Sequence, residues 1–270
     1  MPLPLAAHLR GHNNGTFATP LVFVHGLTFD HRMWEPVLAA LPPGRRALAL
    51  DLPGHGGSPP RDAHDPEALA DAIHETVEAA GIERPIIVGH SAGALAAIAY
   101  AAEHGAPAVV NVDMPLYQEP FARQLKALSP ELHGDAFLQT WARFRESMHQ
   151  ERLPAGMRRL LRAGEAVKQE LLLSYWQPLF ENPLEAVTPW IDDLLARLGD
   201  IPYLTLYGSE PDADERAYVR SRLPHAEIGV WPVGHHFPHL ADPGRFAAAL
   251  TGISVVPSGN PSTSSGARSR

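Results

Sequence analysis

Short apolar runs alternate with helical stretches along this chain, and this alternation limits the possible folds more than any other feature. The runs are often β-branched and end at Gly or Pro, which is typical of strands buried on both faces of a parallel sheet. Strands that alternate with helices predict an α/β fold with a doubly wound, mostly parallel sheet. The six runs cover residues 20–26, 46–54, 84–90, 107–115, 201–208 and 226–234.

The alternation stops over residues 116–199, where no strand pattern occurs and aromatic residues recur among charged ones. We expect this segment to be a helical cap inserted into the core and lying over one edge of the sheet. The α/β core then consists of residues 1–115 and 200–253. Residues 254–270 are rich in Ser, Gly and Pro, a composition that predicts a disordered tail.

Composition excludes several classes of function. The chain has 270 residues, of which 45% are hydrophobic, enough for one sizeable core. Its formal net charge is −8 without a basic cluster, so we expect no nucleic-acid partner. It contains no cysteine, which excludes disulfides and thiolate metal sites. The first apolar run is too short for a signal peptide and no run is long enough to span a membrane, so we expect a cytoplasmic protein.

A serine stands where a predicted strand turns into a predicted helix, in PIIVGHSAGALAAIAYAAEHG (85–105). Ser91 lies between Gly89 and Gly93, and G-x-S-x-G in this context is a nucleophile elbow. Such a turn strains its central residue, needs near-absent side chains on both sides, and presents the hydroxyl at the carboxyl ends of the strands, where open α/β sheets bind ligands. We expect Ser91 to be a nucleophile. The alternative is that it only caps the following helix.

Four motifs make the chain resemble the α/β-hydrolase superfamily over residues 18–252: VFVHGLTFDHRMW, LDLPGHGGS, VGHSAGALAA and GHHFPHLADPGRF. The resemblance implies a serine hydrolase with a helical cap. It also implies an oxyanion hole built from the backbone N–H groups of Leu27 and Ala92, and a loop-stabilising role for Asp51. We expect no cofactor and no metal, because the glycine-rich run 54–57 lacks a following Lys-Ser/Thr and no cluster has metal-ligand spacing.

A serine nucleophile needs a base, and three histidines compete for that role. In the superfamily the catalytic histidine precedes an apolar residue, with a proline seven positions on, which fits His236 with Phe237 and Pro243. His235 occupies a position where the superfamily usually has Gly and stays the alternative. We expect His239 to pack or hydrogen-bond locally.

The acid that orients the base has two candidate positions. The commonest superfamily position, three residues after Gly208, is Pro211 here, so Glu210 or Asp212 would serve only if the loop were one residue shorter or longer. Some haloalkane dehalogenases and zearalenone lactonases carry their acid one strand earlier, which corresponds to Asp113. A carboxylate at the end of a buried strand is costly unless it is paired. We therefore expect Asp113 to be the acid, with Glu210 as the alternative.

These roles predict hydrolysis of a carboxylic ester or lactone of a hydrophobic small molecule through an acyl-enzyme. Cleavage of a carbon–carbon bond or acyl transfer would use the same triad and stays an alternative. A non-catalytic small-molecule receptor is a further alternative, disfavoured by the intact serine and histidine. The predicted cap offers aromatic residues to roof the pocket, namely Trp141, Tyr175 and Trp176, with Phe144 and Phe180. Its arginines leave an anionic substrate open: Arg143, Arg145, Arg158 and Arg159.

Overall fold

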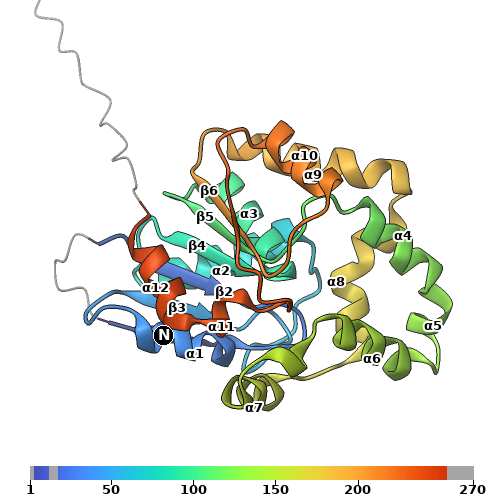
Figure 1. Ribbon diagram of the computed structural model, residues 1–270, viewed down its shortest axis with the longest axis horizontal. Helices are drawn as coiled ribbons and strands as arrows, with labels where there is room; N and C mark the ends of the chain where they lie inside the picture. The colour runs from blue at the N-terminus through green and yellow to red at the C-terminus, as the bar shows by residue number, and fades with distance from the viewer. Residues whose placement is uncertain (1–2, 12–17, 254–270) are drawn as a thin grey trace, which may run out of the picture.

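The computed structural model of the chain describes residues 3–11 and 18–253. These residues form a seven-stranded sheet in the order β1-β3-β2-β4-β5-β6-β7 (Figure 1). Every neighbouring pair is parallel except β1 and β3, which are antiparallel. The predicted α/β fold with a doubly wound, mostly parallel sheet is confirmed. The strands are β1 (Ala7–Arg10), β2 (Leu21–Val24), β3 (Ala47–Leu50), β4 (Ile86–His90), β5 (Val109–Val112), β6 (Tyr203–Tyr207) and β7 (Glu227–Val230).

Strand β1 is the one strand of the described sheet that the sequence pattern did not predict. Its four residues, AHLR, are only half-buried or exposed, and Leu9 is 44% exposed. An edge strand of this kind has neither a continuous apolar run nor a clear alternation. The six predicted runs correspond to β2 to β7, and each strand is shorter than its run.

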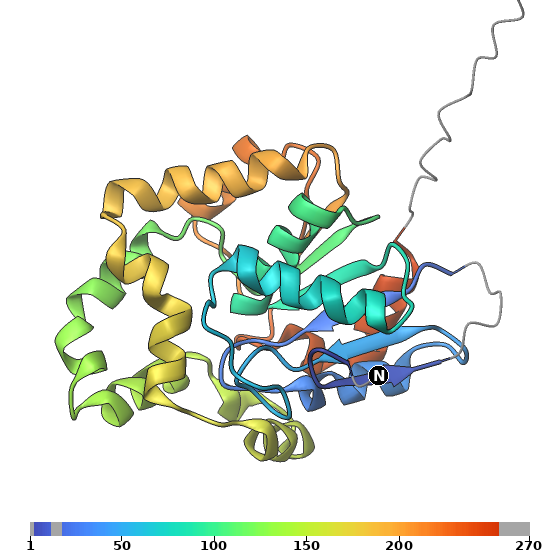
Figure 2. The same ribbon diagram turned by 180° about the vertical axis from the view of Figure 1, so that it is seen from behind.

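The two faces of the sheet carry separate apolar cores. In β2, Leu21 and Phe23 belong to the core with α1, α11 and α12, whereas Val22 and Val24 belong to the core with α2 and α3. This is the alternation expected of a strand with successive side chains on opposite faces. Figure 1 shows the first set of helices and Figure 2 the side with the second. The helices are α1 (Glu35–Ala40), α2 (Pro66–Ala79), α3 (Ala92–His104), α10 (Ala213–Arg222), α11 (Pro238–Ala241) and α12 (Pro243–Thr251), with the 3-10 turn η1 (His31–Trp34).

The connection from β5 to β6 is helical throughout, and α4 to α8 stand beside the sheet as a group (Figure 1). The apolar side chains of α4, α5, α6 and α8 form a third core around Trp141 and Trp176, whereas Leu161 of α7 packs into the core with η1 and α1. The last helix, α9, differs, because Ile191 and Leu194 pack into the core shared with α3. The elements are α4 (Glu119–Ala127), α5 (Ser129–His133), α6 (Phe137–Ser147), η2 (Gln150–Arg152), α7 (Ala155–Gly164), α8 (Gln169–Glu181) and α9 (Leu184–Leu198). We call residues 116–199 the helical insertion.

None of the helices in residues 3–11 and 18–253 combines the length and the apolar character needed to cross a lipid bilayer. The tail predicted over residues 254–270 lies outside the described residues.

Candidate active site

Ser91 occupies the turn between β4 and α3 with a backbone conformation that few residues adopt. Its φ is 51° and its ψ is −132°, a region in which a residue with a Cβ is strained. The flanking glycines are there because nothing larger fits. A Cβ on Gly89 would lie 2.4 Å from the carbonyl oxygen of Gly93, and a Cβ on Gly93 would lie 2.3 Å from that of His25. Main-chain packing therefore fixes the position of the serine.

Asp113 and His236 meet across 123 positions of sequence. Asp113 follows β5, has a φ of 57°, and its N–H donates to the carbonyl oxygen of Leu206 at 2.9 Å. Its Oδ2 accepts a hydrogen bond from His236 Nδ1 at 2.7 Å, and its Oδ1 accepts one from the N–H of Gly208 at 2.6 Å. Both side chains line the same cavity as Ser91.

The bond between Asp113 and His236 depends on the charge of the carboxylate. Burial alone would raise the pKa of Asp113, but the hydrogen bonds from His236 and from the N–H of Gly208 hold it below its ordinary value. The carboxylate is therefore ionised at neutral pH and accepts the Nδ1 proton. This leaves Nε2 as the ring nitrogen of His236 that can take up a proton.

The alternative acids have other partners. Glu210 is exposed and forms an ion pair with Arg216 on α10. Asp212 caps the start of α10, where its Oδ1 accepts the N–H of Glu215 at 2.8 Å. Both residues line the cavity, yet within the described residues neither is hydrogen-bonded to His236.

The alternative bases are held by local packing. His235 lines the cavity, but its Nδ1 accepts the N–H of Phe237 at 3.1 Å. His239 is fully buried, and its ring lies 4.5 Å from the ring of Trp34. Of the three histidines in this loop, His236 is the one that the structure brings to a carboxylate.

Leu27 and Ala92, the candidates for the oxyanion hole, line the same cavity as Ser91. Ala92 is the first residue of α3, and the first N–H groups of a helix have no partner within it. Leu27 follows His25 and Gly26 at the end of β2. Both side chains also contact the apolar core of the helical insertion. The insertion thus closes over the two backbone positions that would receive a negative oxygen.

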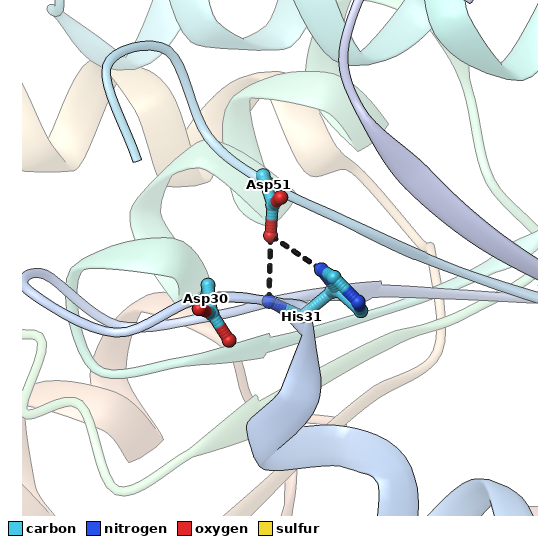
Figure 3. A group of neighbouring side chains, drawn as sticks. All are labelled: Asp30, His31 and Asp51. Atoms are coloured by element: carbon cyan, nitrogen blue, oxygen red, sulfur yellow. Dashed lines mark hydrogen bonds and ion pairs between the residues drawn. The ribbon is translucent and has the colours of Figure 1, made fainter. Parts of the chain in front are cut away.

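The turn that carries Leu27 is held by a cluster of polar groups beneath it. Asp51 Oδ1 accepts hydrogen bonds from the N–H of His31 at 2.7 Å and from its ring Nδ1 at 2.8 Å, as Figure 3 shows. Its Oδ2 accepts the N–H of Gly57 at 2.9 Å. Asp30, the third member of the group in Figure 3, binds the guanidinium of Arg32 through both oxygens, each at 3.0 Å. Because these atoms are already engaged, we assign the cluster to holding the turn in place.

The cavity has a volume of about 550 Å³. Three of the five aromatic residues predicted to roof it, Trp141, Phe144 and Trp176, do line it. The prediction for Tyr175 is wrong, because this side chain faces the core instead. Its hydroxyl donates to the carbonyl oxygen of Pro53 at 2.9 Å, and its ring packs against those of His55 and His64.

His90 is a residue of the site that the sequence analysis did not single out. It is fully buried, and its Nε2 donates to the backbone carbonyl of His236 at 2.8 Å. Burial, together with the nearby His236, lowers the pKa of His90 well below its ordinary value, so its ring is neutral. From the other side, the carbonyl oxygen of Met148 in the helical insertion accepts the N–H of His236 at 3.0 Å. The place of His90 directly before Ser91 was the available signal, whereas a main-chain acceptor such as Met148 leaves none.

The family of the chain follows from comparison with known proteins. A model of the alpha/beta hydrolase family matches residues 21–249. The chain belongs to the alpha/beta hydrolase family. Among curated relatives, a 2-succinyl-6-hydroxy-2,4-cyclohexadiene-1-carboxylate synthase of Serratia proteamaculans (strain 568) is 28% identical, with 88% of this chain and 93% of that protein covered.

Solved structures of this family share the fold at low identity. An enol-lactonase from Burkholderia xenovorans LB400 superposes with a TM-score of 0.70 and 18% identity, over 91% of this chain and 94% of that one. A thermophilic esterase from Thermogutta terrifontis superposes with a TM-score of 0.66 and 20% identity, over 91% of each chain. At these identities the likeness shows the fold of this hydrolase and leaves its substrate to be argued from the site.

Proposed function

We propose that this hydrolase cleaves a carboxylic ester or a lactone of a hydrophobic small molecule through an acyl-enzyme on Ser91. The observation that carries the proposal is the hydrogen bond between Asp113 and His236, 2.7 Å long, in the wall of the cavity that also contains Ser91. A nucleophile on an elbow, a base and a carboxylate that orients the base are the parts that acyl transfer requires.

The proposed reaction begins when Ser91 Oγ attacks the carbonyl carbon and His236 Nε2 takes the hydroxyl proton. Asp113 stabilises the imidazolium that forms. The carbonyl oxygen becomes an oxyanion and accepts hydrogen bonds from the N–H groups of Leu27 and Ala92. As the carbon–oxygen bond breaks, His236 returns the proton to the leaving alcohol. Water then repeats the sequence on the acyl-enzyme, with His236 as its base, and releases the acid.

The cavity supports a hydrophobic, ring-bearing substrate. Trp141, Phe144 and Trp176 line the side formed by the helical insertion, and Phe29 lines the side formed by the core. A volume of about 550 Å³ is in the range of sites for small molecules. The structural neighbours named esterase and enol-lactonase agree with this reaction class. The synthase relatives are named for forming a carboxylate, and we do not extend that activity to this cavity, because no lysine or arginine lines it among the described residues.

The test is the intact mass of the protein after treatment with a fluorophosphonate, on the wild type and on Ser91→Ala. The activated serine displaces fluoride, so we expect one phosphonyl adduct on the wild type and none on the variant. Circular dichroism controls for folding. A folded wild type that forms no adduct with this probe or with a smaller sulfonyl fluoride contradicts the proposal and favours a non-catalytic receptor.

A further inference from the structure

Carboxylates outnumber cationic side chains in the wall of the cavity. Among the residues that the structure describes, four carboxylates line the cavity and no lysine or arginine does. The other ionisable residues in the wall are three histidines and two tyrosines. The carboxylates are Asp113, Glu210, Asp212 and Glu215, and the histidines are His149, His235 and His236.

Glu215 shows most clearly that this charge is built into the fold. It is 4% exposed and lies at the start of α10. Its Oε1 accepts the hydroxyl of Tyr207 at 2.6 Å and the N–H of Leu116 at 2.9 Å, and its Oε2 accepts the N–H of Tyr117 at 2.8 Å. All of these donors are uncharged. They satisfy the carboxylate oxygens but add no positive charge to offset them.

Two arginines bind wall residues from outside the cavity. Arg216 pairs with Glu210 from outside the wall. Arg152 donates to the carbonyl oxygen of Gly234 and lies beside Glu151. The arginines that left an anionic substrate open in the sequence do not line the cavity. Arg143 pairs with Glu131, Arg145 lies 4.0 Å from Glu165, and Arg158 donates to the carbonyl oxygens of Glu151 and Leu153.

We propose that this cavity selects substrates by charge: it accepts uncharged and cationic acyl groups and rejects acyl groups that carry a negative substituent. The inference rests on the proposed ester or lactone hydrolysis and adds the class of substrate. A partly apolar cavity focuses the field of the charges in its wall. An anion that enters loses its hydration and finds no cation in the wall, whereas the aromatic rings and carboxylates both favour a cation. Glu210 and Glu215 are the specificity-determining residues of this proposal.

The experiment compares three substrates that differ only in one remote charge. They are the 4-nitrophenyl esters of 3-phenylpropanoic acid with a para tert-butyl, trimethylammonio or sulfonato group, three substituents of similar shape. The leaving group is the same in all three, and each rate is corrected for spontaneous hydrolysis. We expect kcat/KM to be at least about tenfold higher for the cationic than for the anionic ester, as a field from several carboxylates at about 10 Å predicts. Raising the salt from about 0.02 M to about 0.5 M should reduce this ratio.

A matched pair of variants separates the wall from the overall charge of the protein. Glu210→Gln removes one charge from the cavity, and Glu78→Gln removes one charge from α2, where the side chain is 69% exposed. The ratio of cationic to anionic kcat/KM should fall about threefold in Glu210→Gln and stay within about 1.5-fold in Glu78→Gln. Equal rates for the three esters, a preference for the anion, or the same change in both variants overturns the proposal.

Failure of the charge selection can be told apart from failure of the hydrolase proposal. If the wild type cleaves none of the three esters, hydrolysis of this ester class is at fault. The charge proposal is then tested by binding of the three corresponding primary amides, followed through tryptophan fluorescence, since Trp141 and Trp176 line the cavity. Tightest binding of the cationic amide supports the proposal, and equal or tighter binding of the anionic amide overturns it.

Discussion

The two regions that enclose the cavity hold their side chains in different ways. At the carboxyl ends of the strands, the main chain fixes Ser91 and Asp113, each at a positive φ directly after a buried strand. In the helical insertion, Trp141 and Trp176 are held by packing within a separate apolar core, and their rings lie 6.3 Å apart. Changes at these strand ends should therefore abolish chemistry or folding, whereas changes in the insertion should alter which molecules bind.

The boundary between the two regions is bridged by main-chain hydrogen bonds. The N–H of Ala166 donates to the carbonyl oxygen of Thr28 at 2.7 Å, and the N–H of His236 donates to that of Met148 at 3.0 Å. The insertion thus supports both the turn that carries Leu27 and the loop that carries His236. The two regions therefore hold their side chains in different ways, but the backbone of one supports the backbone of the other.

The largest effect is expected at His236, the proposed base. His236→Gln should lower kcat by about 10³- to 10⁵-fold, because it removes the proposed base for the proton of the Ser91 hydroxyl. His235→Gln is the matched control in the neighbouring position and should lower kcat less than about tenfold, because the ring of His235 accepts a hydrogen bond from the N–H of Phe237 and none is described between it and a carboxylate. The measurement is steady-state hydrolysis of a 4-nitrophenyl ester. A larger loss in His235→Gln would reverse the assignment.

The second-largest loss of kcat is expected at Asp113, the proposed acid. Asp113→Asn keeps the shape of the side chain but removes the charge that orients His236, so kcat should fall by about 10³- to 10⁴-fold. Glu210→Gln should leave kcat for an uncharged ester within about fivefold, because Glu210 is exposed and bonds to Arg216. Both are measured with the same ester. A comparable loss in the two variants would mean that the loop after β6 supplies the acid.

Two glycine substitutions, one in each region, should change the free energy of unfolding in opposite directions. Gly89→Ala places a Cβ within 2.6 Å of three backbone atoms of residues 93 and 94, so it should destabilise the fold by about 3 kcal/mol or more. Gly156→Ala lies in α7, where a Cβ meets nothing within 4 Å, and should stabilise by up to about 1 kcal/mol. Urea unfolding measures both. A stable Gly89→Ala would show that the elbow is less tightly packed than the structure implies.

Neighbouring residues on α8 should separate binding from stability. Trp176→Ala removes a ring from the cavity wall and should lower kcat/KM by about 10- to 100-fold, mainly through KM. Tyr175→Phe loses one hydrogen bond to Pro53 and should cost about 1 kcal/mol in unfolding free energy with kinetics unchanged within about twofold. If Tyr175→Phe changes KM as much as Trp176→Ala does, the side chain of Tyr175 contributes to the cavity and does not face the core alone.

The last prediction concerns stability in acid. Burial alone would raise the pKa of Asp51, but hydrogen bonds from His31 and Gly57 lower it from 3.8 to about 2. A carboxyl group with a lowered pKa contributes stability that is fully present above pH 4 and is lost as the pH falls towards 2. Wild type should exceed Asp51→Asn by about 2 kcal/mol at pH 6, and the difference should shrink between pH 4 and pH 2. Urea unfolding across this range measures it, and a difference independent of pH would contradict the assignment.

The sequence predicted those features that depend on local chain geometry. The six buried runs and the turn at Ser91 are examples, because a strand end, two glycines and a helix start lie next to each other in the chain. The choice between Asp113 and Glu210 depends on where two loops meet in space, which local patterns do not determine. Tyr175 was misplaced for a related reason, since composition gave the aromatic character of α8 but not its rotation about the helix axis.

The position of Asp113 has a consequence for how proteins of this shape can change over time. Ser91 and Asp113 follow the adjacent strands β4 and β5, and the N–H of Ser91 donates to the carbonyl oxygen of Val112 at 2.9 Å. Because the proposed acid, Asp113, follows β5, residues 209–212 take no part in the proposed proton transfer. That loop can then vary in length and charge while the reaction is preserved. Substitutions that change substrate preference, whether natural or from directed evolution, should therefore arise in residues 209–212 before they arise at the strand ends.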